Sequence, residues 1–377
     1  MKLHTLPCFD GFRCAASDCR DSCCVGWEID VDADTLDLYR QVGGSFGARL
    51  EQSIVTEADG ASHFRLTPEE RCPFLNADNL CDIILRLGEG ALCDICDQHP
   101  RFYNDYDNLQ ETGLGLCCEA AGRLLFASDR LLTIRATETE EDAPDEASAE
   151  TLPLLLHLRE QLFGLLQDRS LPLQTRFADL LLYAQTAQDA WDGQDLDALC
   201  DAEELAADLL PFGEAAWGEG EPSDLPAELL RFFGTLESIN GEWDALLRAA
   251  VDCLALPDRP ALEARFRADM AERGYEYEHL AFYFLYRYFL HAVDDGDFLS
   301  RVCLALLSVL AVRRLDFARW HQNGERFTLE DRIAVARIFS KELEYSEENM
   351  AAFLAEIRDS DQFSPNALLE ALSGGPL

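Results

Sequence analysis

Cysteines are concentrated at one end of this chain. Eleven of the fourteen in the 377 residues lie at or before residue 118, and "CAASDCRDSCCVGW" (residues 14–27) alone holds four. Thiolate sulfur is soft and binds zinc or the iron of iron–sulfur clusters well. Turn-forming sequences such as "VGGSFG" and "YNDYDN" punctuate the same region, so it has little regular structure from which to build a core. The pattern predicts an irregular N-terminal region stabilised by metal.

Two features favour a reducing compartment. Residues 1–14 lack the apolar run of a secretory signal. The longest apolar stretch, residues 302–312, is too short to span a bilayer and predicts a core helix instead. We therefore expect a cytoplasmic protein without disulfides, in which clustered thiols indicate metal or redox chemistry.

The charge balance excludes some partners. The chain has 71 acidic residues against 31 lysines and arginines, a net charge of -40. Nucleic-acid binding needs clustered basic residues that replace counterions, and an anionic membrane surface attracts the same residues. We expect no nucleic acid and no membrane among its partners. Lysine is nearly absent, with only Lys2 and Lys341.

The fold class is predicted to be mainly α. Residues 1–130 form the Cys-rich metal-binding region with short strands, and residues 137–150 read as an acidic linker. Residues 151–377 are predicted to be an all-α domain. Its clearest helical patterns repeat apolar residues at three and four and cover residues 152–166, 176–190, 225–239, 278–293 and 297–315.

The N-terminal region offers several local signals. Residues 63–66 and 101–116 predict strands, the second a hairpin that turns at residues 104–108. Short helices are expected over residues 32–41, 81–87 and 119–128. The glycine-rich residues 41–47 follow a helix rather than a strand, so we expect a loop there and not a nucleotide-binding turn.

Cysteine spacing constrains the metal. Only Cys93 and Cys96 have the C-x-x-C spacing of a zinc knuckle, whereas iron–sulfur clusters accept looser spacing, so we favour a [4Fe–4S] cluster with zinc as the alternative. Neighbouring side chains in extended backbone point to opposite sides. Both cysteines of the pairs Cys23–Cys24 and Cys117–Cys118 would therefore not easily reach one metal ion. Either two centres form or some cysteines pack beside one centre. Cys19 and Cys23 match the first two cysteines of the CxxxCxxC motif of radical S-adenosylmethionine enzymes, but Gly26 stands at the position of the third. The sequence therefore does not support radical chemistry of that kind.

Four segments together resemble one family, the flagellin lysine-N-methylases, which are related to CxxCxxCC-type cysteine-cluster domains. The segments are "FRCAASDCRDSCCVGWEIDVD" (12–32), "RCPFLNADNLCDIILRLGEGAL" (71–92), "CDQHPR" (96–101) and "LCCEAAGRLL" (116–125). They cover the first third of the chain. The chain departs from the family pattern at His99, where Tyr is usual, at Cys118, where Pro is usual, and at Cys93, where Ser is more typical.

The resemblance implies a set of metal ligands. Matched one by one, the cysteines of the family fall on Cys14, Cys19, Cys23, Cys24, Cys72, Cys81, Cys96 and Cys117. Cys8 and Cys93 are additions to the pattern.

The resemblance also implies an activity, the transfer of a methyl group from S-adenosylmethionine to lysine side chains of flagellin. Such an enzyme desolvates the lysine ammonium and accepts its proton before the amine attacks. The alternative interpretation is a non-enzymatic iron- or zinc-binding carrier or sensor. The sequence identifies no general base.

Further residues have two interpretations each. Arg101 pairs either with a carboxylate of the methyl donor or with an internal acid, and Glu119 is a helix N-terminal charge or a base. Trp27 is expected to shield the metal centre from water. The tyrosine-rich residues 275–289 favour a buried core helix over a cage for lysine or sulfonium. His63 and His99 are structural or are extra ligands.

Overall fold

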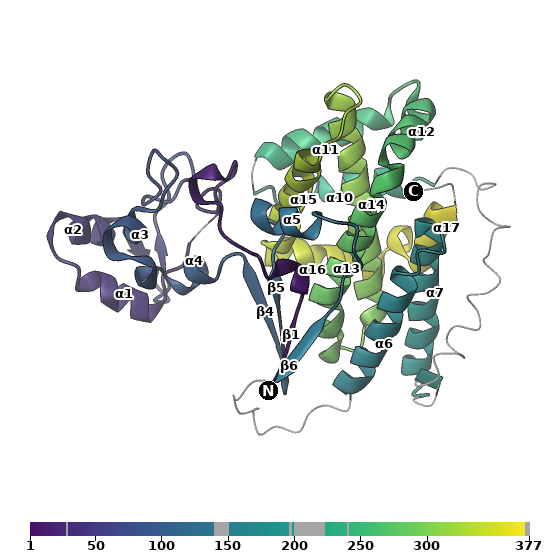
Figure 1. Cartoon of the computed structure of the whole chain (residues 1–377), viewed down its shortest axis with the longest axis horizontal. Helices are drawn as coiled ribbons and strands as arrows, with labels where there is room; N and C mark the ends of the chain where they lie inside the picture. Colours follow the sequence, from purple (N-terminus) through teal and green to yellow (C-terminus); the bar gives the residue numbers. More distant parts are fainter. Residues whose placement is uncertain (28, 139–150, 196–197, 200–222, 240, 374–377) are drawn as a thin grey trace.

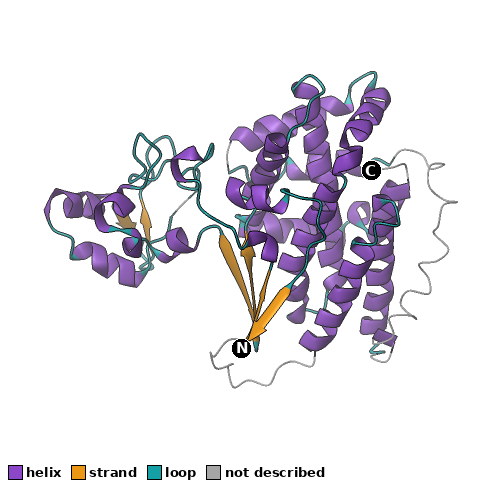
Figure 2. Ribbon diagram, viewed as in Figure 1, coloured by secondary structure: helices purple, strands orange, loops and turns teal. Residues whose placement is uncertain are grey.

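The computed structural model describes residues 1–377 except 28, 139–150, 196–197, 200–222, 240 and 374–377. Its described part is mainly helical with a few short strands, as the sequence predicts (Figure 2). A small Cys-rich lobe projects from a larger helical body, and a sheet lies between them (Figure 1). The expected acidic linker covers residues 137–150, of which 139–150 lie outside the described residues. Its first two residues, Thr137 and Glu138, belong to a strand instead.

The lobe, residues 20–98, has its own apolar core. Tyr39, Phe64 and Phe74 are buried there, with edge-to-face and stacked ring contacts. Its helices and paired strands are α1 (Ala33–Arg40), α2 (Gly44–Ser53), β2 (Ile54–Thr56), β3 (Ser62–Phe64), α3 (Asp82–Leu87) and α4 (Asp94–Gln98). The helices expected over residues 32–41 and 81–87 are confirmed as α1 and α3, and β3 falls on the first strand expected in this region.

The loop expected over residues 41–47 is wrong in its second half, because α2 begins at Gly44. Phe46 and Leu50 are four residues apart and both pack into the core of the lobe. Their burial outweighs the low helix propensity of the glycines in this segment.

The sheet joins both ends of the N-terminal region. Its strand order is β4-β5-β1-β6, with β4 (Arg101–Tyr106) and β5 (Leu109–Leu114) forming the predicted hairpin. β1 (Lys2–Thr5) lies parallel to β5, pairing Lys2 with Leu109, and antiparallel to β6 (Arg135–Glu138). Neither β1 nor β6 was expected from the sequence.

The helical body packs around one long helix. α14 (Phe298–Gln322) contacts α13 (Tyr275–Tyr288), α11, α7, α15 and α16. The other helices are α5 (Glu119–Leu125), α6 (Thr151–Leu166), α7 (Leu173–Asp192), α10 (Leu225–Phe233), α11 (Gly241–Leu254), α12 (Arg259–Met270), α15 (Leu329–Glu344), α16 (Glu347–Asp359) and α17 (Pro365–Ser373). These confirm the helices predicted from apolar periodicity, and α5 confirms the one expected over residues 119–128.

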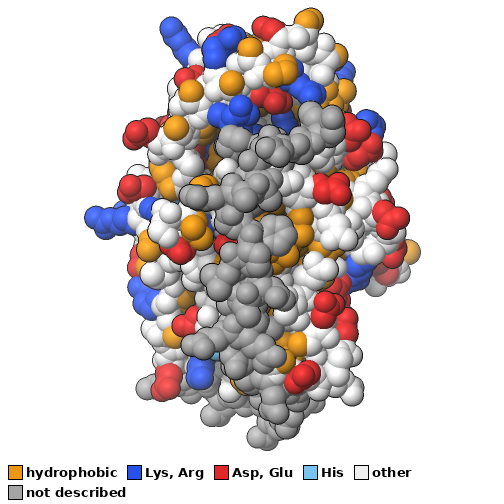
Figure 3. Space-filling model, turned by 90° about the vertical axis from the view of Figure 1, so that its right-hand side faces the viewer, with side chains coloured by type: hydrophobic (Ala, Val, Ile, Leu, Met, Phe, Trp, Pro, Cys, Tyr) orange, Lys and Arg blue, Asp and Glu red, His pale blue; other side chains and the backbone are white. Residues whose placement is uncertain are grey.

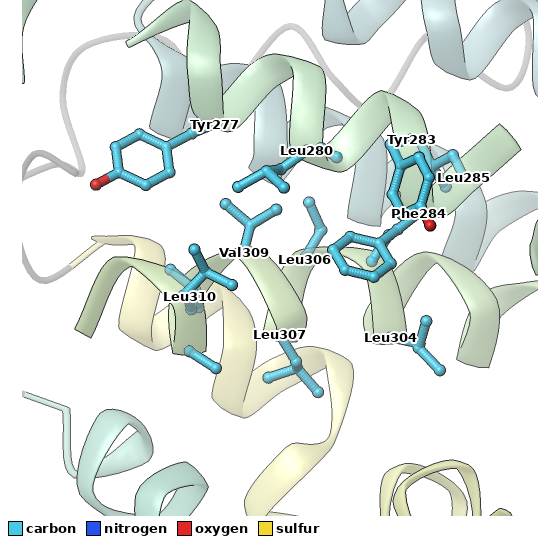
Figure 4. Close-up of a cluster of buried hydrophobic side chains, with 14 of the residues drawn as sticks. Tyr277, Leu280, Tyr283, Phe284, Leu285, Leu304, Leu306, Leu307, Val309 and Leu310 are labelled. Atoms are coloured by element: carbon cyan, nitrogen blue, oxygen red, sulfur yellow. The ribbon is translucent and has the colours of Figure 1, made fainter. Parts of the chain in front are cut away.

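The tyrosine-rich helix α13 is a core helix, as predicted. Figure 4 shows Tyr283 and Phe284 of α13 facing Leu306 and neighbouring apolar residues of α14. On its other side α13 supports the sheet, because the hydroxyl of Tyr286 donates to the carbonyls of His4 and Thr112. Residues from both the sheet and the helices therefore share one apolar core.

None of the helices in the described ranges combines the length and apolar character needed to cross a membrane. On the face shown in Figure 3, acidic and basic side chains are interspersed over the described part, without a broad patch of one sign.

Candidate functional site

One group of thiols gathers where the chain enters the lobe. Cys118, the residue before α5, interacts electrostatically with Cys14, Cys19 and Cys23. Burial raises the pKa of Cys19 to about 11 and also raises that of Cys118. We call these four residues thiol group 1. It joins a loop from the start of the chain to the N-terminus of a helix almost one hundred residues later.

A second group lies inside the lobe. Cys24 interacts with Cys72, Cys81 and Cys96, and Cys93 forms a hydrogen bond with Cys96. We call these five residues thiol group 2. The vicinal cysteines connect the two groups: Cys23 interacts with the thiols of group 1, Cys24 interacts with those of group 2, and the two side chains are hydrogen-bonded to each other. They lie in a turn, so the alternation expected of extended backbone does not apply to this pair.

The thiols of group 2 differ in their readiness to ionise. The hydrogen bond from Cys23 lowers the pKa of Cys24 to about 7, and the hydrogen bond from Cys96 lowers that of Cys93. Burial raises the pKa of Cys72 to about 12. Thiolates are the form that binds metal, so Cys24 and Cys93 are the most favourable donors of this group.

The thiols of both groups are donors that suit a soft metal, but in the described part of the chain their side chains do not converge into a ligand shell. Every cysteine in the described part of the chain is a free thiol. Within that part, no three His, Cys, Asp or Glu side chains converge closely enough to hold a metal ion. The predicted ligand set therefore stays a prediction.

The two thiol groups include seven of the eight predicted ligands. The eighth, Cys117, points elsewhere: it is buried, with Sγ 3.9 Å from Nε2 of His99. Its neighbour Cys118 lies with group 1 instead, and Cys93 lies with group 2. Both of these residues are departures from the family pattern, so matching by the pattern left them out.

An aromatic contact fastens the lobe to the helical body. The indole of Trp27 stacks on the ring of Tyr345, with centroids 4.9 Å apart, and lies edge-on to His99 at 5.3 Å. The indole nitrogen of Trp27 donates to the carbonyl of Cys23 over 2.7 Å. Burial, with a smaller contribution from Lys341, lowers the pKa of His99 to about 4, so its ring is neutral at pH 7.

Ion pairs reinforce this contact. Lys341 of α15 is buried, and its Nζ donates to the carbonyl of Val25 over 3.0 Å and to the carboxylate of Asp21 over 3.3 Å. Arg337, one turn earlier on the same helix, also pairs with Asp21. Asp21 and Val25 flank the vicinal cysteines, so α15 holds the segment that carries Cys23 of group 1 and Cys24 of group 2.

Behind this contact lies a buried carboxylate. The side chain of Glu344, at the end of α15, is 0 % exposed and pairs with Arg287 over 3.0 Å. It also accepts hydrogen bonds of 2.9 Å from the hydroxyls of Tyr283 and Tyr288 on α13. A carboxylate with this many partners is fixed in position and serves to align α13 with α15.

A small pocket opens beside the sheet. It has a volume of about 200 Å³ and lies between β4, β5 and the turn that follows β1. Leu6, Phe9 and Leu114 form its buried floor, while Asp10 and Arg101 are exposed at its rim. Sequence reasoning missed this pocket, because its walls come from segments one hundred residues apart.

Three residues with open interpretations have defined contacts in the structure. Arg101 forms no ion pair with an acid in the described part of the chain; its guanidinium lies 5.4 Å from the ring centroid of Phe12 and reaches the carbonyl of Asp97 over 3.5 Å. Glu119 is the first residue of α5, as expected for a helix N-terminal charge, and accepts a hydrogen bond from the backbone of Arg20. His63 lies on β3, 3.9 Å from Glu57.

Comparisons with known proteins place the chain in a family. Residues 159–370 match the FliB lysine N-methylase C-terminal domain. The chain is 33 % identical over 134 residues to the lysine-N-methylases of Salmonella typhimurium and Salmonella choleraesuis, covering 34 % of this chain and 33 % of each relative. It is 31 % identical over 134 residues to the flagellar biosynthetic protein FliU of Salmonella muenchen, covering 79 % of that protein.

The match thus spans about a third of the length of the two lysine-N-methylases. No solved structure matches this chain. Because the domain match covers more than half of the residues, including the helices α7 and α10–α16 that build the core, the chain belongs to the FliB lysine N-methylase family.

Proposed function

We propose that this protein is an S-adenosylmethionine-dependent protein lysine N-methyltransferase that acts on flagellin and carries a Cys-ligated metal centre. The observation that carries the proposal is the match of residues 159–370 to the lysine N-methylase domain. The flagellar name of the FliU relative supports flagellin as the substrate. The proposal includes a cytoplasmic location, for which the support is the sequence alone.

The chemistry is a direct displacement. The nitrogen lone pair of a neutral lysine attacks the methyl carbon of the donor, a C–N bond forms, and the C–S bond breaks with its electrons moving to sulfur. S-adenosylhomocysteine leaves, and the proton lost by the ammonium passes to a base or to water. Positioning the two reactants in line supplies much of the acceleration.

The metal is proposed as a structural element, because this methyl transfer moves no single electron. A [4Fe–4S] cluster, or zinc as the alternative, would be held by thiols from the predicted set, in which the hydrogen bond from Cys23 lowers the pKa of Cys24 to about 7 and favours its thiolate. When bound, such a centre cross-links the loops of the lobe. The ordered lobe would then be linked to α15 of the helical body by the contacts of Trp27, Lys341 and Arg337.

The test is anaerobic purification followed by incubation with flagellin and S-adenosylmethionine. We expect visible absorption from an iron–sulfur cluster, or zinc by elemental analysis, and an intact-mass gain on flagellin in steps of one methyl group. Flagellin with chemically blocked lysines is the control and should gain nothing. A metal-loaded, folded protein that leaves unblocked flagellin unchanged would refute the proposal and favour the carrier or sensor interpretation.

A further inference from the structure

The pocket beside the sheet combines an apolar floor with two opposite charges. Its floor, formed by Leu6, Phe9 and Leu114, is between 2 and 8 % exposed. Asp10 and Arg101 stand at the rim, one acid and one base. A pocket of this composition is complementary to a small ligand that carries both charges and an apolar stem.

Arg101, the base at the rim, has no acidic partner in the described part of the chain. In the described part of the chain, Arg101 meets only the ring of Phe12 and a carbonyl at 3.5 Å, which is the weak end of the hydrogen-bond range. Packing against Phe12 fixes the plane of the guanidinium and leaves its donors available. An arginine held in this way is suited to bind a carboxylate through two parallel hydrogen bonds.

The acid at the rim is held in place. Asp10 forms a two-pronged pair with Arg135 of β6, which holds the pKa of Asp10 below its usual value. It therefore stays ionised at neutral pH. A carboxylate oxygen has lone pairs for more than one donor, so Asp10 retains the capacity to accept a hydrogen bond from an ammonium group.

The size of the pocket limits what enters it. Its volume of about 200 Å³ lies below the roughly 300–1,000 Å³ of sites that enclose a whole drug-sized ligand. It suits one end of such a ligand, with the remainder outside. A substrate lysine fits the charges less well, because its side chain brings only a cation and would meet Arg101 without a partner for it.

We propose that this pocket binds the amino-acid end of the methyl donor: Arg101 takes the carboxylate, Asp10 takes the ammonium, and Phe12 lies beside the chain that leads to the sulfonium. The inference rests on the proposed function, since it assumes S-adenosylmethionine as the donor. It places donor binding next to thiol group 1, because Phe12 precedes Cys14 by two residues.

The experiment is isothermal titration of the full-length, metal-loaded protein with S-adenosylmethionine and with its decarboxylated analogue, which lacks only the carboxylate. Hydrogen bonds to charged groups are worth about 1.5–3 kcal/mol, so the wild type should bind the analogue roughly 10- to 100-fold more weakly. Arg101→Gln should weaken binding of S-adenosylmethionine by a similar factor. It should bind the two compounds within about threefold of each other, because the carboxylate has then lost its partner.

The matched control is Arg40→Gln, which removes an exposed arginine of α1 that pairs with Asp37. It should bind both compounds like the wild type. Arg101→Lys is the second variant, and it should retain part of the discrimination because it keeps the charge but not the fork. Thermal unfolding of each variant verifies that it is folded.

The outcomes separate two failures. If the wild type binds S-adenosylmethionine and Arg101→Gln still discriminates between the two compounds as the wild type does, the pocket assignment is wrong and the proposed function stands. If binding is normal and Arg101→Gln weakens only flagellin, the pocket belongs to the protein substrate, which also overturns the assignment. If the wild type binds neither compound, the proposed function itself fails.

Discussion

The ammonium of Lys341 lies over the indole of Trp27, 5.0 Å from the ring centroid. The same Nζ donates to the carbonyl of Val25, so one buried side chain of α15 contacts the segment that carries Cys23 and Cys24. Cation–π contacts and charge-assisted hydrogen bonds gain strength when water is excluded. Through these contacts of Lys341, α15 anchors the Cys-rich lobe to the helical body.

Replacing this lysine should loosen the lobe. We expect Lys341→Met to reduce the free energy of unfolding by about 2–4 kcal/mol, because it leaves the half-buried carbonyl of Val25 without this donor and removes one of the two cations beside Asp21. Urea unfolding measures the loss. The chain supplies its own control in Lys2, its one other lysine, which is exposed on β1. Equal effects of Lys341→Met and Lys2→Met would show that the buried contact contributes nothing.

A glycine on the other side of the aromatic contact should be just as sensitive. A Cβ on Gly115 would lie 2.5 Å from the hydroxyl oxygen of Tyr345 and 3.4 Å from the carbonyl oxygen of Pro100. Gly115→Ala should therefore displace the Tyr345 ring from Trp27 and cost about 1–3 kcal/mol, the range for overpacked cores. Urea unfolding and near-ultraviolet circular dichroism report the two effects.

Gly90 is the matched position for this experiment. It lies in the same N-terminal region, has ordinary backbone geometry and has no atoms within 4 Å of an added Cβ. Gly90→Ala should leave stability unchanged or raise it slightly, since alanine restricts the unfolded chain. A Gly115→Ala protein as stable as Gly90→Ala would mean that Tyr345 moves without cost.

The vicinal cysteines make a further prediction about metal. Cys118 interacts with three thiols of group 1, whereas Cys117 is buried against His99. If metal is bound at group 1, Cys118→Ser should lower the metal content of anaerobically purified protein more than Cys117→Ser does. Elemental analysis measures this. Cys8→Ser, outside both groups, is the control and should retain wild-type metal; a greater loss from Cys117→Ser would restore the assignment made from the family pattern.

Local patterns were enough to predict most elements of this fold. The apolar spacing of α6, α7 and α14 and the Asn- and Asp-rich turn between β4 and β5 are signals contained within each segment. Burial of the tyrosine-rich α13 was predictable for the same reason, because its aromatic residues surround the helix.

The contacts between distant segments were not predictable from those patterns. β1 is four residues long, and its pairing with β5 joins Lys2 to Leu109 without any local signal. The pocket depends on that pairing, since Leu6 and Asp10 follow β1 whereas Arg101 begins β4. The contact of Lys341 with Trp27 spans more than three hundred residues. Such placements follow from packing of the whole core, which one sequence does not specify by periodicity.

Asp179 of α7 makes stability depend on pH. It is 7 % exposed, and burial, together with the nearby charge of Asp168, raises its pKa from 3.8 to about 6. Below pH 3.8 both the folded and unfolded states hold this proton, so the residue contributes nothing. As pH rises from 3.8 to 6, the unfolded state releases the proton first, and stability falls.

The loss is complete above pH 6 and amounts to about 3 kcal/mol at 1.36 kcal/mol per pKa unit. Asp179→Asn cannot ionise, so it should exceed the wild type by about 3 kcal/mol at pH 7.5 but by only about 1 kcal/mol at pH 4.5. Urea unfolding at both pH values measures the difference. Asp189→Asn, at an exposed position on the same helix, should show no such change with pH. A gain from Asp179→Asn that is equal at both pH values would show that the carboxyl titrates normally and that its burial carries no electrostatic cost.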